Sequence, residues 1–288
     1  MSRVHDALRR AETAGAFSGA AVRAERRSAI ETGPNLAGLL DQVHEFSFRP
    51  SPSSLLLDMD RPTEGPIEEF RTLRTRLNHM KSLQTLSSVV VTSPSPSEGK
   101  SMTAANLAIA EAHISGNNTL LADFDFRRPT VHNLFGIQRS PGLTEYLQGK
   151  ARLHEIIHKV SGTNLYIMPA GEAVTNPQEL LNLRQVKLLL NRLPAVFNWI
   201  LLDTPPLLFA ADANHLSTLT NGTLLVVRLG QTTIDSVTRA MNSLCNNNVL
   251  GVHVNAAREK DLYNKYTYYS GGKEEQGEFE YVNEGEEE

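Results

Sequence analysis

The chain has 288 residues, 40% of them hydrophobic, and a formal net charge of −4. This apolar fraction is sufficient for one well-buried core, whereas no apolar run approaches the roughly 18 residues that a membrane-spanning helix needs. Charged residues throughout residues 1–12 exclude a secretory signal peptide. We therefore expect a cytoplasmic chain that reaches the inner face of the cell membrane only through a partner.

The first 64 residues are expected to lie outside the main fold. Apolar residues share one helical face within residues 3–12, which predicts a short amphipathic helix over 1–12, either a docked arm or a handle for a partner. Residues 13–64 are rich in Ala, Ser, Gly, Pro and Arg and show no sustained periodicity. They predict a flexible linker, with a short helix near 36–46.

From residue 65 to 260 the chain predicts one doubly wound, mostly parallel α/β domain, because short apolar strands alternate with helical periodicities. The expected strands are 88–92, 120–122, 165–168, 199–202, 223–228 and 249–255. The expected helices are 67–80, 102–115, 177–193, 211–219 and 234–246.

A candidate phosphate-binding loop follows the first of these strands, in the sequence VVVTSPSPSEGKS. Backbone N–H groups of such a loop face phosphate, Lys100 would neutralise phosphate charge, and the Ser101 hydroxyl would bind Mg²⁺. The full G-x-x-x-x-G-K-[ST] pattern is broken because Pro94 occupies the first glycine position. Taken alone, Gly99-Lys100-Ser101 fits an ordinary strand-to-helix turn equally well.

Three carboxylates at the ends of two further apolar strands strengthen this interpretation. Asp123 and Asp125 end the strand in LLADFDFRRP, and Asp203 ends the strand in WILLDTPP. Residues two apart in an extended segment point to the same side, and buried carboxylates are costly unless a cation offsets them. The pattern predicts one shared metal site rather than three unrelated aspartates.

This combination of motifs resembles the bacterial tyrosine kinases of exopolysaccharide biosynthesis. Further stretches are similar to that family: an E-x-x-R-x-x-R segment, GLTEYLQG at 142–149, NPQELL at 176–181 and VVRLGQT at 226–232. The resemblance covers residue 65 to the C-terminus and includes the N-terminal MSRVHDALRRAE. It implies a P-loop fold with deviant Walker motifs and an ATP- and Mg²⁺-dependent protein-tyrosine autokinase.

The resemblance also implies roles for individual residues. Asp123 would take the proton of the acceptor tyrosine, Asp125 and Asp203 would organise Mg²⁺ with Ser101, and Arg127 would lie near the phosphates. The expected nucleotide-binding residues are Ser97, Glu98, Gly99, Lys100, Ser101, Met102 and, on the adenine side, Asn255. Asn255 fits a turn-forming residue after a strand equally well.

One residue departs from the family pattern, because Ser97 stands where the family usually has glycine. If this position requires a left-handed backbone, serine costs on the order of 1 kcal/mol. A weakly active or regulatory member of the family is therefore one interpretation.

The C-terminal tail, residues 261–288, is expected to be disordered. Its last 18 residues hold eight glutamates and one lysine, a net charge of −7. The tail nevertheless carries five of the seven tyrosines: Tyr263, Tyr266, Tyr268, Tyr269 and Tyr281. The resemblance implies phosphoacceptors for the active site of a neighbouring subunit, while docking of the tail on a surface is the alternative.

The resemblance implies partners as well. Glu68, Arg71 and Arg74 of the E-x-x-R-x-x-R segment would form the interface of a homo-oligomer. The alternative is a solvated helix face with ion pairs within the helix. A separate transmembrane chain-length regulator would activate the kinase, a cognate tyrosine phosphatase would reverse it, and no nucleic-acid partner is expected.

Two alternatives to a kinase follow from the same residues. A non-kinase P-loop ATPase, similar to septum-positioning and chromosome-partition proteins, would carry a signature lysine where this chain has Ser95. A catalytically silent nucleotide-binding scaffold of polysaccharide assembly is the other alternative, and the Ser97 departure favours it.

Overall fold

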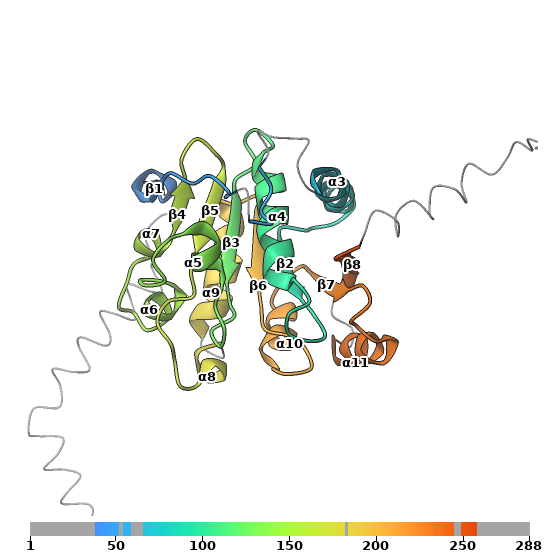
Figure 1. Ribbon diagram of the computed structural model, residues 1–288. Coiled ribbons are helices and arrows are strands. Elements are labelled where there is room, and N and C mark those ends of the chain that lie inside the picture. The colour runs from blue at the N-terminus through green and yellow to red at the C-terminus, as the bar shows by residue number, and fades with distance from the viewer. Residues whose placement is uncertain (1–37, 52–53, 59–65, 182–183, 245–248, 258–288) are drawn as a thin grey trace, which may run out of the picture.

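The computed structural model describes residues 38–51, 54–58, 66–181, 184–244 and 249–257. Its strands form one eight-stranded sheet in the order β1-β4-β5-β3-β6-β2-β7-β8, with helices on both faces (Figure 1). All neighbouring strands in this sheet are parallel except β4 and β5. The predicted doubly wound α/β fold is therefore confirmed.

The strands agree closely with the sequence prediction. They are β1 (His44–Phe46), β2 (Ser88–Thr92), β3 (Thr119–Asp123), β4 (His158–Val160), β5 (Leu165–Met168), β6 (Trp199–Asp203), β7 (Gly222–Arg228) and β8 (Val249–Asn255). The six predicted strands are all present, each with ends within one residue of those expected. β1 and β4 were not predicted.

The helices differ more from the prediction. They are α3 (Ile67–Leu83), α4 (Lys100–Ala112), α5 (Val131–Phe135), α6 (Leu143–Leu147), α7 (Leu153–Ile156), α8 (Pro177–Leu181), α9 (Arg184–Arg192), α10 (Asp212–Ser217) and α11 (Ile234–Leu244), with 3-10 turns η1 (Leu40–Gln42) and η2 (Leu193–Ala195). The predicted helix 177–193 corresponds to α8 and α9, and α4 begins two residues earlier than expected, at the end of the candidate phosphate loop.

Part of the segment expected to be a linker is built into the fold, so this part of the prediction was wrong. β1 pairs in parallel with β4, and Lys159 of β4 forms an ion pair with Glu45 of β1 at 2.7 Å. Further along, Asn106 of α4 accepts the N–H of Leu57 and donates to the carbonyl of Leu55, both at 2.9 Å. Such contacts are not visible in a local pattern, because a three-residue strand is too short to show alternation.

The central strands bury both faces, and their alternation determines where the strand-end residues point. In β6, Trp199 and Leu201 pack into the core on the side of α3, α4 and α5, whereas Ile200 and Leu202 pack against the helices of the other face. Asp203 continues the first series. Its side chain is therefore directed to the face on which α4 begins.

Candidate functional site

The candidate phosphate loop connects β2 to α4 through two residues with left-handed backbone. Ser97 has φ +63° and Gly99 has φ +93°, so the left-handed backbone considered for position 97 is present. At position 99 only glycine fits, because a Cβ atom there would lie 1.9 Å from Nδ2 of Asn255. Ser97 is not a glycine, so its left-handed backbone is strained, at a cost on the order of 1 kcal/mol.

The Glu98 side chain connects the phosphate loop to the segment after β7 through two hydrogen bonds. Its side chain is buried; Oε2 accepts the backbone N–H of Ser95 at 2.8 Å, and Oε1 accepts the hydroxyl of Thr232 at 2.6 Å. Charge-assisted bonds of this kind are stronger than neutral ones. Glu98, predicted to contact nucleotide, therefore acts in this structure on the shape of the loop.

Two residues at the ends of β7 and β8 donate hydrogen bonds to the backbone of the same loop. Arg228, at the end of β7, donates from Nη1 to the carbonyl of Ser97 at 3.2 Å. Asn255, at the end of β8, donates from Nδ2 to the carbonyl of Glu98 at 3.0 Å. The structure thus places Asn255 against the loop backbone, and its adenine-side role stays a prediction.

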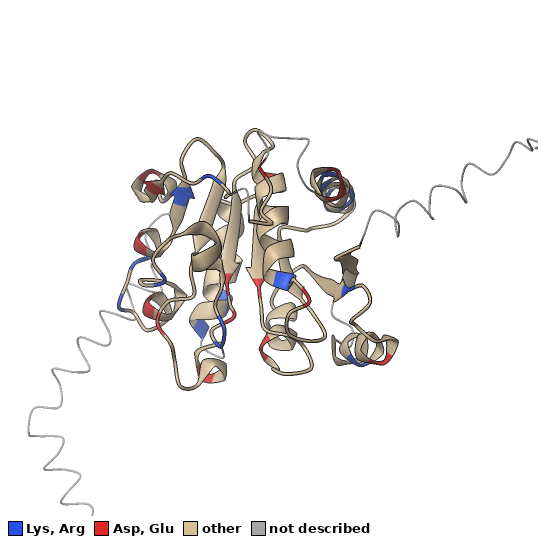
Figure 2. Ribbon diagram, viewed as in Figure 1, with Lys and Arg blue, Asp and Glu red and all other residues tan. Residues whose placement is uncertain are grey.

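Lys100 lies at the centre of the site, between two carboxylates. Its Nζ is 3.0 Å from Oδ2 of Asp125 and 3.5 Å from Oδ1 of Asp203, and it donates to the hydroxyl of Ser101 at 3.1 Å. Figure 2 shows this grouping as acidic residues at the ends of β3 and β6 beside a basic residue at the start of α4. Residues predicted from three separate motifs are therefore brought together.

The register of the sheet explains this convergence. Asp123 of β3 is paired with Asp203 of β6, and Asp203 is also paired with Val91 of β2. The three strands are parallel neighbours, so their carboxyl ends meet at one edge beside the loop that follows β2.

Burial and charge act in opposite directions on the ionisable groups of the site. Burial lowers the pKa of Lys100, but the nearby Asp203 and Asp125 outweigh it, so this pKa is raised. For Asp203, burial raises the pKa of the carboxyl group, and the nearby Lys100 ammonium only partly opposes this shift. Because Asp203 has no exposed surface, we consider burial the dominant effect on it.

The environment of Asp203 fits a hydrated divalent cation. Both of its carboxylate oxygens are enclosed, and beyond the Lys100 ammonium at 3.5 Å and the Ser101 hydroxyl no described residue gives them a hydrogen bond. The Ser101 hydroxyl also lies beside Asp203, and it is 3.1 Å from the Lys100 ammonium. Across the part of the chain that the structure describes, no three His, Cys, Asp or Glu side chains converge as direct metal ligands. This donor set fits Mg²⁺, which usually keeps several waters and takes only one or two carboxylates.

Asp123 is enclosed more tightly than a group exposed to substrate. Oδ1 accepts the N–H of Asp125 at 3.1 Å, and Oδ2 accepts the N–H groups of Thr130 and Val131, each at 3.0 Å. Burial and the neighbouring Asp203 raise the pKa of Asp123 well above its usual range, although these N–H bonds oppose the shift. The structure therefore shows Asp123 joining β3 to the start of α5.

Arg127 does not reach the group around Lys100. Its Nε donates to Oδ2 of Asp212 at 2.9 Å, and this ion pair raises the pKa of Arg127. Asp212, the first residue of α10, is buried. Met102, also predicted to contact nucleotide, lies in the first turn of α4 and packs partly against the core.

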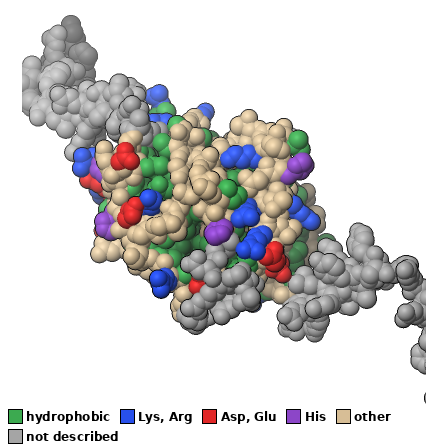
Figure 3. Space-filling model, turned by 90° about the horizontal axis from the view of Figure 1, so that it is seen from above, with side chains coloured by type: hydrophobic (Ala, Val, Ile, Leu, Met, Phe, Trp, Pro, Cys, Tyr) green, Lys and Arg blue, Asp and Glu red, His purple; other side chains and the backbone are tan. Residues whose placement is uncertain are grey.

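The predicted interface residues on α3 behave differently from one another. Glu68 forms an ion pair with Arg71 along the helix, and both lie at the surface. Arg74 instead donates to the carbonyl of Ala110 in α4 at 2.9 Å. Figure 3 shows the molecule from above, with Lys, Arg and His side chains interspersed with Asp and Glu over that face. The subunit interface itself stays a prediction.

Sequence reasoning missed several residues that shape the site. Thr232 and Arg228 belong to the VVRLGQT stretch, which the resemblance singled out without giving it a role. Asp212 gave no signal, because a lone aspartate near a helix start is common. The predicted N-terminal helix and the tail with its five tyrosines lie outside the described residues.

A glycine-lysine-serine loop between a strand and a helix, with strand-end carboxylates on its lysine, defines a P-loop nucleotide-binding protein of the doubly wound α/β class. The septum-site-determining protein MinD of Pyrococcus horikoshii, solved with Mg-ADP, shares this fold. It is 20% identical, the match covers 62% of this chain and 74% of that chain, and the TM-score is 0.51.

Within this class, the chain belongs to the bacterial tyrosine-protein kinase family. It is 33% identical over 216 residues to the tyrosine-protein kinase YwqD of Bacillus subtilis, covering 74% of this chain and 90% of that protein. It is 32% identical to the tyrosine-protein kinase etk of Escherichia coli K12, covering 65% of this chain but only 26% of that longer protein. No protein-family model matches the chain.

Solved structures agree with this membership. The kinase domain of Escherichia coli ETK matches with a TM-score of 0.66 and 28% identity, covering 73% of this chain and 84% of that domain. The chimeric protein CapA2B2 matches with a TM-score of 0.67 and 29% identity, covering 75% of this chain and 94% of that one. None of the helices in the described part of the chain is both long and apolar enough to cross a membrane.

Proposed function

We propose that this chain is an ATP- and Mg²⁺-dependent protein-tyrosine kinase that phosphorylates tyrosines of its own C-terminal tail. The observation that carries this proposal is the position of the Lys100 ammonium, 3.0 Å from Asp125 and 3.5 Å from Asp203 at the end of the phosphate loop. Family membership supplies the acceptor type, and the five tail tyrosines supply acceptors within the chain.

In the proposed reaction, the tyrosine oxygen attacks the γ-phosphorus of ATP, the bond between the γ-phosphorus and the β–γ bridging oxygen breaks, and ADP leaves. Lys100 offsets the negative charge that the phosphates carry, and the loop N–H groups orient them. Mg²⁺ would be held by the Ser101 hydroxyl and, through water, by Asp125 and Asp203, and it supplies further charge neutralisation.

The tyrosine proton needs an acceptor, and Asp123 is the proposed one. Its Oδ1 accepts only one N–H, so this oxygen keeps a lone pair for a proton. Because Asp123 has no exposed surface, the side chains that cover it must move before a tyrosine can approach it. Opening of active-site segments before the chemical step is common in enzymes.

We further propose that the reaction occurs between subunits of a homo-oligomer, at the inner face of the cell membrane, where a separate membrane protein activates it. Its role would be the control of exopolysaccharide synthesis and export, with a cognate phosphatase restoring the tail. Membership of the bacterial tyrosine-protein kinase family, together with the motifs that resemble the kinases of exopolysaccharide biosynthesis, supports a setting of this kind. Each tail phosphate adds roughly −1.5 to −2 charge, so phosphorylation should loosen subunits held together by tail docking.

Mixing two chains, one without an active site and one without acceptor tyrosines, tests the proposal. One chain carries Lys100→Met, which removes the phosphate-binding charge without changing core volume, and the other has an intact site but phenylalanine at all five tail tyrosines. Neither should acquire phosphotyrosine alone, and the Lys100→Met chain should acquire it on mixing with Mg-ATP, measured by mass spectrometry of the tail. ATP hydrolysis without phosphotyrosine would favour the P-loop ATPase alternative, and nucleotide binding without either would favour the scaffold.

A further inference from the structure

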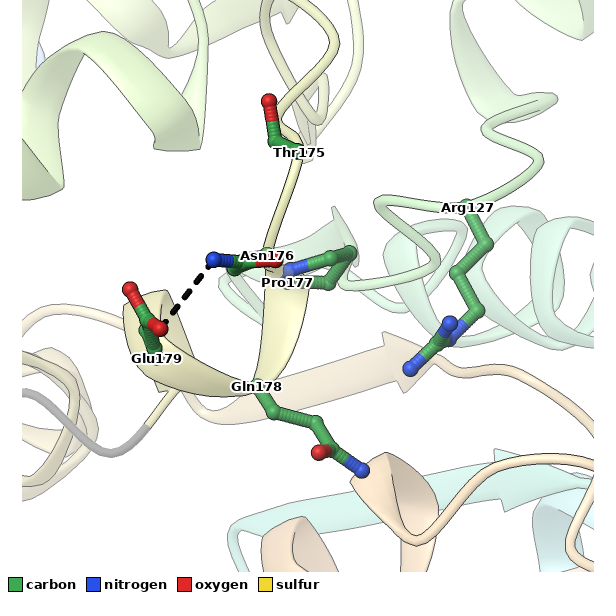
Figure 4. Close-up of a pocket in the computed structure, with 6 residues that line it drawn as sticks. All are labelled: Arg127, Thr175, Asn176, Pro177, Gln178 and Glu179. Carbon is green, nitrogen blue, oxygen red and sulfur yellow. Dashed lines mark hydrogen bonds between the residues drawn. The ribbon is translucent and has the colours of Figure 1, made fainter.

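A pocket of about 280 Å³ lies beside the proposed kinase site, and the reaction proposed above does not use it. It is lined by Arg127, Thr175, Asn176, Pro177, Gln178 and Glu179. Figure 4 shows the Arg127 side chain extending towards Gln178 from one side, with residues 175–179 forming the other side. The lining is mostly polar, so a polar or charged ligand group fits it.

Arg127 is held in position before any ligand binds. The Asp212 carboxylate, whose side chain is 1% exposed, accepts from Nε at 2.9 Å and lies 3.5 Å from Nη2. The Arg127 side chain is 41% exposed, and the described residues give its Nη1 group no acceptor. A fixed guanidinium with a spare donor loses little conformational entropy when it binds an anion.

The charges of the pocket are separated. Glu179, the only acidic side chain of its lining, accepts from Nδ2 of Asn176 at 3.1 Å. In Figure 4 this pair lies on the opposite side of Pro177 from the Arg127 guanidinium. A ligand carboxylate is therefore favoured at the Arg127 end and disfavoured at the Glu179 end.

The Arg127 end is also the end nearest the reacting groups. Arg127 is two residues from Asp125, whose Oδ2 pairs with Lys100, so the two Cα atoms are at most about 7 Å apart. One extended peptide could therefore place a tyrosine at the proposed site and the side chain of a residue one to three positions away at Arg127.

The tail tyrosines differ in whether they offer such a side chain. Tyr281 follows Glu278 and Glu280, at three and one positions before it. Tyr268 has no acidic residue within three positions on either side. The chain thus contains one acidic acceptor sequence and one matched sequence without acid.

We propose that this pocket is an acceptor-recognition site that binds the carboxylate of a glutamate preceding the acceptor tyrosine. The inference rests on the proposed function, because it assigns a substrate class to the same site. Arg127 is then a specificity-determining residue that selects Tyr281 over Tyr268 in the tail of a second copy of the chain.

Peptide binding tests the pocket without requiring catalysis. The probe is a fluorescent peptide of residues 276–286, compared with the same peptide carrying Glu278→Gln and Glu280→Gln. The protein is the full chain with these two substitutions in its own tail, so that the tail does not compete. We expect the glutamate peptide to bind about five-fold tighter in low salt, from one partly exposed charge-assisted contact.

Two variants of the protein locate the binding. Gln178→Glu places a carboxylate beside Arg127 and should abolish the five-fold difference. Gln148→Glu, the same change at the exposed residue that follows α6 and lies outside the pocket, should preserve it. Equal affinity for the two peptides, or a difference that survives Gln178→Glu, would overturn the proposal.

A kinetic measurement separates failure of the pocket from failure of the kinase. In the mixing experiment, the acceptor chain with Lys100→Met is compared with one that also carries Glu278→Gln and Glu280→Gln. The ratio of phosphate on Tyr281 to phosphate on Tyr268 should fall about five-fold. An unchanged ratio overturns only the pocket assignment. Absence of phosphate on every tyrosine contradicts the kinase proposal, and the peptide measurement still decides the pocket.

Discussion

Ser97 stands where the family resemblance leads us to expect glycine, and the structure gives this difference a physical meaning. Its backbone is left-handed, with φ +63°, where glycine would be free of strain. Arg228 donates to its carbonyl at 3.2 Å and helps to hold this conformation. The loop therefore keeps its shape through external support and not through local preference.

Substitution at Ser97 should show how much strain the loop tolerates. Ser97→Gly relieves about 1 kcal/mol of strain but loses a similar amount through the freer unfolded chain, so the free energy of unfolding should stay nearly constant. Ser97→Val places a β-branched side chain at positive φ and should lower this free energy by about 1–2 kcal/mol. Urea denaturation measures both, and a valine variant as stable as the serine chain would contradict the argument.

The reacting residues were predictable because they follow strand ends. Lys100, Asp125 and Asp203 each follow an apolar run, and parallel strands bring such positions to one edge. The anchoring of Arg127 by Asp212 was not predictable, because these residues are 85 apart and neither belongs to a periodic pattern. A polar contact between residues far apart in the chain cannot be predicted from the spacing of neighbouring residues.

At the scale of elements, α3 and α4 are joined by a buried polar network. Asn78 of α3 donates to both carboxylate oxygens of Glu111 in α4 at 2.9 Å, and Asn117 donates to Oε2 at 3.0 Å. The Nε1 group of Trp199 donates in turn to Asn78 at 3.3 Å, and Lys81 lies 4.5 Å from the centre of the Trp199 ring. This network fixes the end of α4 that is remote from the phosphate loop.

Glu111 should make stability depend on pH near neutrality. Burial raises its pKa from 4.5 to about 7, against the opposing effects of Asn78 and Arg74. Since the folded chain holds this proton more tightly than the unfolded chain, the free energy of unfolding should decrease as pH rises from about 4.5 to about 7.

The variant Glu111→Gln keeps the shape and removes the charge, so it should flatten this part of the stability profile. Urea denaturation at several pH values measures the effect, with exposed Glu155→Gln as the matched control. A slope that is unchanged in Glu111→Gln would show that Glu111 does not titrate in this range.

The elements that sequence reasoning missed share one property. β1, β4 and the short helices α5, α6 and α7 have five residues or fewer, so their periodicity cannot be read. The strands β2, β3, β5 and β6 are equally short, but they were found because each consists mainly of consecutive apolar residues, whereas the longer helices show their amphipathic pattern over several turns. Tertiary pairing, and not local propensity, decides whether the short segments are regular.

At the scale of the whole molecule, the structure divides the predicted interface motif into two functions. Within the described residues the Arg71 side chain pairs with Glu68 of its own helix, whereas Arg74 joins α3 to α4 through the Ala110 carbonyl. A neighbouring subunit can therefore bind Arg71 and Glu68 at little cost, but it must compete with an existing contact for Arg74.

Separate alanine variants should distinguish these functions. Arg71→Ala should reduce oligomer size in light scattering and leave the unfolding free energy within about 0.5 kcal/mol of the unchanged chain. Arg74→Ala should lower the unfolding free energy by about 1 kcal/mol or more, because it removes a partly buried charged donor. If Arg74→Ala altered only oligomer size, its contact with Ala110 would be incidental.

The hydrogen bond from Asn255 to the Glu98 carbonyl affects when the phosphate loop can be completed during synthesis of the chain. The amide that supports the loop lies 157 residues after the carbonyl that it binds. At about 5–20 residues per second, the ribosome completes β8 on the order of ten seconds or more after it has produced the loop. Until residue 228 has been made, the strained backbone at Ser97 has neither Arg228 nor Asn255 beside it, and after that it still lacks Asn255. A nascent chain therefore cannot present a finished phosphate loop, and nucleotide competence arrives only with the last strand.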